Sequence, residues 1–66
     1  MTRIEFAERI TRILKNEGAR IDGPFVKTKT TALGGSTLAQ IEGMATEAGM
    51  GWVITSDATG NLQILY

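Results

Sequence analysis

Neither cysteine nor histidine occurs anywhere in this chain of 66 residues. A domain of this size buries only about 60% of the surface that its unfolded chain exposes, and many such domains rely on disulfides or a bound metal. The composition excludes disulfides, zinc fingers, thiol nucleophiles and imidazole acid–base catalysis. The fold therefore depends on a well-packed apolar core, or on a second copy of the chain that covers part of that core.

Hydrophobic residues make up 42% of the chain and charged residues 21%, as in ordinary globular domains. The seven basic and seven acidic residues give a net charge of zero. No apolar run has the length of a membrane span, and the N-terminus lacks the apolar segment of a signal peptide. We expect one small domain over residues 1–66, located in the cytoplasm and without a membrane partner.

The N-terminal residues carry the clearest helix signal. Thr2-Arg3-Ile4-Glu5 has the form of a capping box, in which the threonine hydroxyl and the glutamate carboxylate each accept a backbone hydrogen bond. The apolar residues that follow share a stripe about 120° wide on a helical wheel: Phe6, Ala7, Ile10, Ile13 and Leu14. Gly18 is suited to end the helix, so the pattern predicts a helix over about residues 3–17.

The segment after this helix is consistent with two structures. Asp22-Gly23-Pro24 is a turn sequence, and residues 25–33 are rich in β-branched side chains, which favour an extended strand. Lys27 and Lys29 would then suit an edge strand, where charge prevents further pairing. The alternative is a short helix over about residues 26–33. We favour the strand.

A second helix follows, with Ser36 or Thr37 at its N-cap and Gly49 after its last residue. Asp57-Ala58-Thr59-Gly60 then matches a type I turn between two strands. The sequence therefore predicts a small α+β domain in the order helix, strand, helix and β-hairpin, with a three-stranded antiparallel sheet. Four residues are expected in its core: Ile10, Leu38, Ile41 and Ile54.

The register of the hairpin follows from its turn. With Asp57 opposite Asn61, period-2 alternation places one set of side chains towards the helices: Trp52 opposite Tyr66, Ile54 opposite Ile64 and Ser56 opposite Leu62. The other side of the hairpin carries Val53, Thr55, Gln63 and Leu65. Two helices cover only one face of such a sheet, so this second side is expected to stay open.

The chain offers little chemistry for catalysis. A serine nucleophile needs a base such as histidine, and the sequence has none. Glu42 and Glu47 lie about 140° apart on their helix, and Asp22 and Asp57 lie in turns, so neither pair indicates a metal or acid–base site. The glycine-rich segment 33–37 lacks the lysine of a phosphate-binding P-loop. We expect no catalytic, cofactor-binding or metal-binding residues, and a protein that is not an enzyme.

The second half of the chain combines a helix and a hairpin in a characteristic order. The residues that form this pattern are Ser36-Thr37-Leu38 at the start of the second helix, Glu47-Ala48-Gly49-Met50 at its end, and the hairpin segments Trp52–Ser56, Asp57–Gly60 and Leu62–Tyr66. In this pattern, residues 36–66 are similar to the last helix and wing of winged-helix domains. The resemblance implies that the helix enters the major groove and that the wing contacts phosphate. The chain departs from the family upstream, where the family has a helix and a strand is predicted here.

The distribution of charge disfavours DNA as a partner. Residues 1–35 hold all seven basic and four acidic residues, a net charge of +3, whereas residues 36–66 hold three acidic residues and no basic one. Because affinity for DNA comes mainly from neutralising phosphates, the acidic half would be repelled. Nucleic-acid binding, through a winged helix or through the basic residues, is therefore the second hypothesis.

The leading hypothesis is a non-enzymatic protein-binding module of the inhibitor or adaptor type, like the anti-defence and anti-CRISPR proteins of phages and mobile elements. Its expected contact surface is the open side of the hairpin: Val53, Thr55, Gln63 and Leu65. A basic surface is the alternative, made up of Arg9, Arg12, Lys15, Lys27 and Lys29. A homodimer is a further hypothesis.

Overall fold

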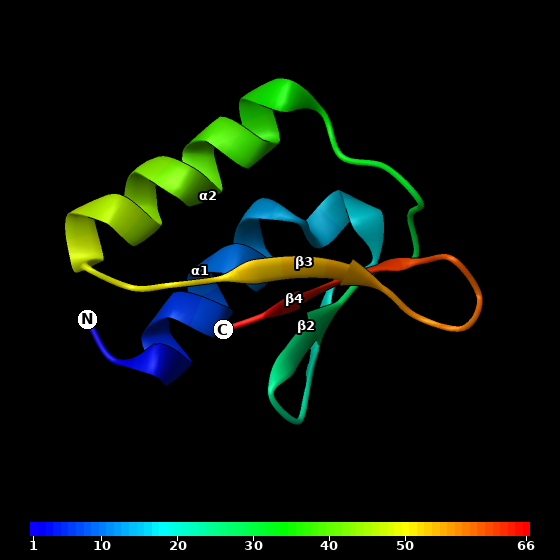
Figure 1. Cartoon of the computed structure of the whole chain (residues 1–66), viewed down its shortest axis with the longest axis horizontal. Coiled ribbons are helices and arrows are strands. Elements are labelled where there is room, and N and C mark those ends of the chain that lie inside the picture. Colours follow the sequence, from blue (N-terminus) through cyan, green and yellow to red (C-terminus); the bar gives the residue numbers. More distant parts are fainter.

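The computed structural model describes all of residues 1–66, with helices packed against one antiparallel sheet (Figure 1). The helices are α1 (Arg3–Ile13), the short 3-10 helix η1 (Lys15–Glu17) and α2 (Gly35–Ala48), and the strands are β1 (Arg20–Asp22), β2 (Phe25–Lys27), β3 (Val53–Ser56) and β4 (Leu62–Leu65). The strands lie in the order β1-β2-β4-β3, and every neighbouring pair is antiparallel. The α+β class is therefore confirmed, but the sheet has four strands and not the three predicted.

The capping box at the start of α1 is formed as the sequence predicts. The Thr2 hydroxyl accepts a hydrogen bond from the Glu5 amide, and the Glu5 carboxylate accepts one from the Thr2 amide, both at 3.1 Å. Helical structure then continues to Glu17, with its last turn tightened into η1. It ends at Gly18, whose φ of +67° lies in the left-handed region that glycine adopts without strain.

The segment between the helices forms a hairpin, β1–β2, where the sequence predicts a single strand. Strand β2 ends at Lys27, but the next residue, Thr28, is still hydrogen-bonded to β4. Its amide and its hydroxyl both donate to the Leu62 carbonyl, at 3.0 and 2.9 Å. The alternative of a helix over residues 26–33 is therefore wrong. Strand β1 is not evident in the sequence because three exposed residues, two of them charged, are too short a run to show period-2 alternation.

The β3–β4 hairpin has the predicted register as far as its strands extend. Ile54 lies opposite Ile64, and the Asp57 amide donates to the Asn61 carbonyl at 2.9 Å. The predicted pairing of Trp52 with Tyr66 is wrong, since the ladder ends one position earlier. These two side chains find other partners, because polar groups within reach satisfy the indole N–H and the phenol hydroxyl, as described below.

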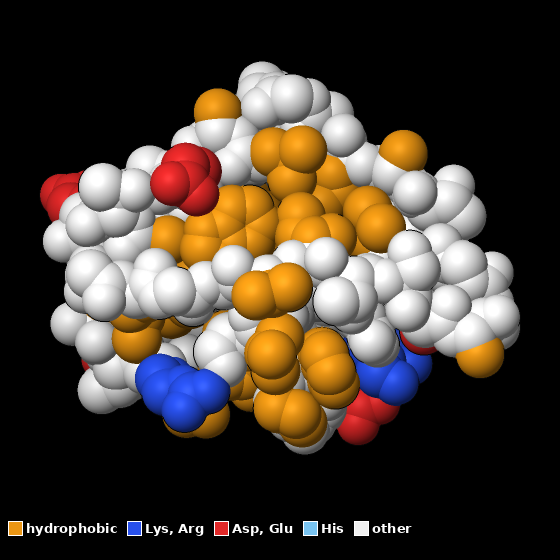
Figure 2. All heavy atoms as spheres, viewed as in Figure 1, with side chains coloured by type: hydrophobic (Ala, Val, Ile, Leu, Met, Phe, Trp, Pro, Cys, Tyr) orange, Lys and Arg blue, Asp and Glu red, His pale blue; other side chains and the backbone are white.

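Eight apolar side chains are buried where the helices meet the sheet: Phe6, Ala7, Ile10, Leu14, Val26, Ile41, Ala45 and Ile64. Ile10 and Ile41 are fully buried, as predicted. Leu38 and Ile54 are only partly buried, so their assignment to the buried core is wrong. Leu38 lies in the first turn of α2 and Ile54 on an edge strand, so each has neighbours on fewer sides; apolar side chains are in view between α2 and β3 in Figure 2.

The winged-helix resemblance does not extend to the architecture. Residues 20–27 form the β1–β2 hairpin, so the helix that should precede α2 in a helix-turn-helix unit is missing. Strand β4 lies between β2 and β3, so the predicted wing is built into the sheet and does not project from it. The expectation of a winged-helix arrangement is therefore corrected to an α-β-β-α-β-β order with one four-stranded sheet.

Candidate functional site

One face of the sheet carries no helix, and we call it the open face. The core side chains Val26 and Ile64 point towards the helices, so alternation places their neighbours along each strand on the opposite side. Strand pairing arranges these neighbours in two rows across the sheet. The apolar row is Phe25–Leu65–Val53, with Asp22 beyond Phe25 at its end, and the polar row is Arg20–Lys27–Gln63–Thr55. The four residues predicted as a contact surface, Val53, Thr55, Gln63 and Leu65, are thus all on the open face.

The apolar row exposes large side chains to solvent. Val53 is 52% exposed and Leu65 is 38% exposed, while Phe25 beside them is half-buried. Figure 2 shows a group of apolar side chains on the near side below β3, with basic side chains on either flank. Single exposed apolar residues are common on protein surfaces, but three in one row across neighbouring strands form a contiguous patch of the kind found at contact sites.

The polar row gives the open face a positive charge. Arg20 and Lys27 contribute two cations against the single carboxylate of Asp22, whose Oδ2 lies 3.5 Å from the lysine Nζ. Gln63 donates from Nε2 to the Thr55 hydroxyl at 3.1 Å, so this pair is held in place without a charge. The open face is therefore cationic although residues 36–66 are acidic overall, because its charges come from β1 and β2.

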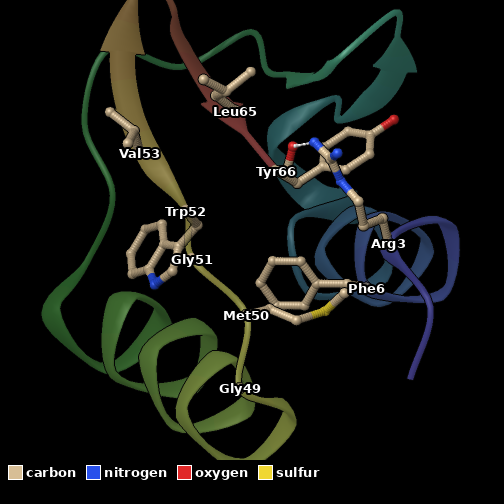
Figure 3. A pocket seen from close by; sticks show the side chains of 9 residues that line it. All are labelled: Arg3, Phe6, Gly49, Met50, Gly51, Trp52, Val53, Leu65 and Tyr66. Carbon is tan, nitrogen blue, oxygen red and sulfur yellow. Dashed lines mark hydrogen bonds between the residues drawn. The ribbon is translucent and has the colours of Figure 1, made fainter.

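A pocket of about 480 Å³ opens where β3 and β4 separate, beyond the pair Val53 and Leu65. On one side, the Trp52 indole N–H donates to the Glu42 carboxylate at 3.0 Å, which turns this side chain towards α2. On the other side, the Tyr66 hydroxyl donates to the Gly23 carbonyl at 2.9 Å. Figure 3 shows the resulting space and its lining residues: Arg3, Phe6, Gly49, Met50, Gly51, Trp52, Val53, Leu65 and Tyr66.

Arg3 is the one charged residue that lines this pocket. Its guanidinium donates a hydrogen bond to the Tyr66 carbonyl oxygen, drawn as a dashed line in Figure 3. The sequence does not predict this pocket, because the pocket depends on where the pairing of β3 with β4 ends. The one feature of the sequence that could have indicated a pocket is the pair Gly49 and Gly51, on either side of Met50 just before β3. These two glycines leave the lining of the pocket without side chains at two positions.

The alternative basic surface is divided by the fold. Arg9 lines a hollow between the helices together with Glu5 and Glu47, whereas Arg12 and Lys15 line a different hollow beside Glu8 and Ile21. The first hollow therefore has two carboxylates beside its one arginine, whereas the second has one carboxylate beside its two cations.

The two remaining lysines are also apart from each other. Lys27 lies on the open face, whereas the Lys29 side chain packs over Gly18, so close that a Cβ added to this glycine would lie 2.9 Å from the lysine Cδ. The structure therefore places Arg9, Arg12 and Lys15 on the helix layer, and Lys27 on the open face apart from Lys29.

Two carboxyl groups have a lowered pKa, and in both the cause is a set of hydrogen bonds that stabilises the fold. The pKa of Glu5 is lowered because its carboxylate accepts from the Thr2 amide, and further by the hydrogen bond with the Thr2 side chain. The pKa of Asp57 is lowered mainly by the hydrogen bond from the Thr59 hydroxyl to its carboxylate, at 2.6 Å. One group caps α1 and the other stabilises the β3–β4 turn, so neither shift marks a reactive centre.

No group of three or more carboxylate side chains lies close enough together to hold a metal ion. Neither helix combines the length and the hydrophobicity that a membrane span requires. Comparisons with protein-family models, with curated proteins and with solved structures give no match to this chain.

Proposed function

We propose that this chain is a non-enzymatic protein-binding module, of the inhibitor or adaptor type, that contacts another protein with its open face. The observation that carries the proposal is the apolar row, in which Val53, Leu65 and Phe25 lie side by side on a sheet face without helix cover. A solvated sheet face normally alternates to polar residues, so an apolar row there is the feature that needs an explanation.

The apolar row alone is too small for tight binding. Complete burial of a valine or leucine side chain contributes about 1.5–3 kcal/mol. With Val53 52% and Leu65 38% exposed, covering what remains of both contributes about 1.4–2.7 kcal/mol. Micromolar affinity requires about 8 kcal/mol, so a partner must also use the polar row and neighbouring surface.

The size of a typical interface leads to the same conclusion. A stable complex buries about 800 Å² on each partner, which is about a fifth of the 4013 Å² that this protein exposes. We expect a contact of this size to cover both the open face and the adjoining pocket. Because Arg20, Lys27 and Arg3 surround the apolar row, we expect the partner surface to be acidic around an apolar centre.

The test begins with affinity capture from the source cell, with and without nuclease, and identification of the captured protein by mass spectrometry. The identified protein is then purified, and its affinity is measured by calorimetry for the wild type, Val53→Glu and Leu65→Glu. Ile21→Glu is the matched control, since Ile21 is 42% exposed but pairs with Val26, so that alternation places it on the helix side of the sheet.

We expect each open-face substitution to weaken binding at least tenfold, while Ile21→Glu binds as the wild type. Capture that depends on nucleic acid, or full affinity in both open-face variants that melt as the wild type does, would contradict the proposal. Sedimentation of the chain alone, which measures its oligomeric state, completes the test. If the chain forms a dimer and Leu65→Glu dissociates it, the open face binds a second copy of the chain and not a different protein.

A further inference from the structure

The pocket beside the open face has the chemistry of a specific anchor site. We infer that it receives one apolar side chain of the partner protein, aromatic or leucine-sized, and that Arg3 pairs with a carboxylate next to that side chain. The inference rests on the proposed function, because it identifies the group by which the partner is recognised. It concerns residues that lie outside both rows of the open face, apart from Val53 and Leu65.

The walls of the pocket are largely apolar, and three of the lining side chains are aromatic. Phe6, Met50, Trp52 and Tyr66 surround the space in Figure 3. Its volume of about 480 Å³ lies within the range of about 300–1,000 Å³ that is typical of pockets that hold organic groups. Binding energy at protein interfaces is concentrated where an anchor side chain enters such a pocket, and aromatic walls supply large contact area.

Arg3, the one cation at the pocket, indicates that the expected ligand carries a negative charge. Arg3 donates to the Tyr66 carbonyl, and a guanidinium has five N–H donors, so further donors are available to a ligand. Arg3 is also the first residue of α1, where the helix dipole adds to the attraction for an anion. No acidic residue lines the pocket, and an arginine pairs best with a carboxylate in a two-pronged contact.

The pocket is continuous with the open face. Val53 and Leu65 belong to the apolar row and also line the pocket, where they lie at its end in Figure 3. A partner that covers the apolar row therefore reaches the pocket without a gap. Positive charge lies on both sides of the apolar row, because Arg20 and Lys27 lie at one side of it and Arg3 at the other.

Gly51 offers a way to block the pocket without disturbing the fold. It lines the pocket, its φ lies outside the left-handed region, and a Cβ built on it meets no atom within 4 Å. Gly51→Leu therefore places an apolar side chain into open space. Gly43→Leu is the matched control, because the same Cβ at Gly43 also meets nothing within 4 Å but extends from the exposed side of α2.

The first experiment measures the pocket itself with two probes of nearly equal shape, 3-phenylpropionate and its neutral amide, 3-phenylpropanamide. Binding is followed in ¹⁵N–¹H correlation spectra, where Trp52, the one tryptophan of the chain, gives a single indole signal. In the wild type we expect shifts at Met50, Gly51 and the Trp52 indole, with the acid bound at least fivefold more tightly than the amide.

The variants separate the apolar pocket from the cation. Arg3→Gln is expected to bring the ratio of acid to amide affinity close to one, while Arg12→Gln keeps the wild-type ratio. Gly51→Leu is expected to abolish the shifts for both probes, and Gly43→Leu to leave them unchanged. Equal affinity for acid and amide in the wild type, or shifts that survive in Gly51→Leu, would overturn the inference.

The second experiment uses the purified partner and distinguishes this inference from the proposed function. We expect Arg3→Gln and Gly51→Leu each to weaken the complex at least fivefold, in protein whose thermal melting matches that of the wild type. If Val53→Glu and Leu65→Glu abolish binding while Arg3→Gln and Gly51→Leu bind fully, the open face is the contact surface but the anchor pocket is refuted.

Discussion

Ile10→Ala tests the packing on which the open face depends. Ile10 is fully buried in the core cluster that also contains Phe6, Leu14, Val26 and Ile64, so it belongs to the packing between α1 and the sheet. The substitution removes about three methylene equivalents at about 0.8 kcal/mol each, and the cavity that remains adds to this loss. We expect a total cost of about 3–4 kcal/mol.

This cost is large for a chain of 66 residues, whose total stability is expected to be about 3–10 kcal/mol. For so small a domain, each kcal/mol lowers the melting temperature by about 4–8 °C. Ile10→Ala should therefore melt at least about 12 °C below the wild type, or be unfolded at 25 °C. Circular dichroism during heating, and Trp52 fluorescence during urea unfolding, measure the change.

Ile4→Ala is the matched control for this prediction. It is the same chemical change on the same helix, but at a side chain that is 58% exposed, so we expect a cost within about 0.5 kcal/mol of zero. If Ile10→Ala melted within a few degrees of the wild type, or lost no more stability than Ile4→Ala, the assignment of the buried face of α1 would be wrong.

Three further predictions concern local structure. Gly43→Ala should stabilise the protein by up to about 1 kcal/mol in urea unfolding, because the added methyl group meets no atom within 4 Å and alanine favours a helix; a loss of stability would show that α2 needs the glycine. Thr2→Ala should cost about 1 kcal/mol, since the Glu5 amide loses its acceptor, and an unchanged urea midpoint would show that the cap contributes nothing. The hydrogen bonds that lower the pKa values of Glu5 and Asp57 favour the folded state above the ordinary carboxyl range, so stability should fall as acid protonates both groups, from about pH 4 downwards. Asp57→Asn should reduce the slope of stability against pH in this range, and an unaltered slope would contradict the role given to the turn.

Features with short-range chemical causes are the part of the fold that the sequence predicts well. The capping box at Thr2 and Glu5 acts within one helical turn, and the turn beginning at Asp57 determines which residues of the last two strands face each other. Alternation then assigns Val53 and Leu65 to the open side without knowledge of the remaining fold.

The features that the sequence does not predict depend on contacts between distant segments. Strand β1 exists because Arg20 and Asp22 find partners across a hairpin, and nothing in three exposed residues indicates this. The polar row crosses the whole sheet only because β2 pairs with β4 and brings Lys27 beside Gln63. The pocket likewise appears only because the β3–β4 ladder ends one position before Trp52.

The most direct test of the central claim is to map the contact surface in the reconstituted complex by NMR. The ¹⁵N-labelled chain is titrated with its unlabelled, purified partner, and signals that shift or broaden identify the residues in contact. We predict that these signals belong to the open face and the pocket, with Phe25, Lys27 and Leu65 among them. Changes confined to the exposed side of α1, around Arg9 and Arg12, would show that the partner binds the helix layer and that the open face is not the functional surface.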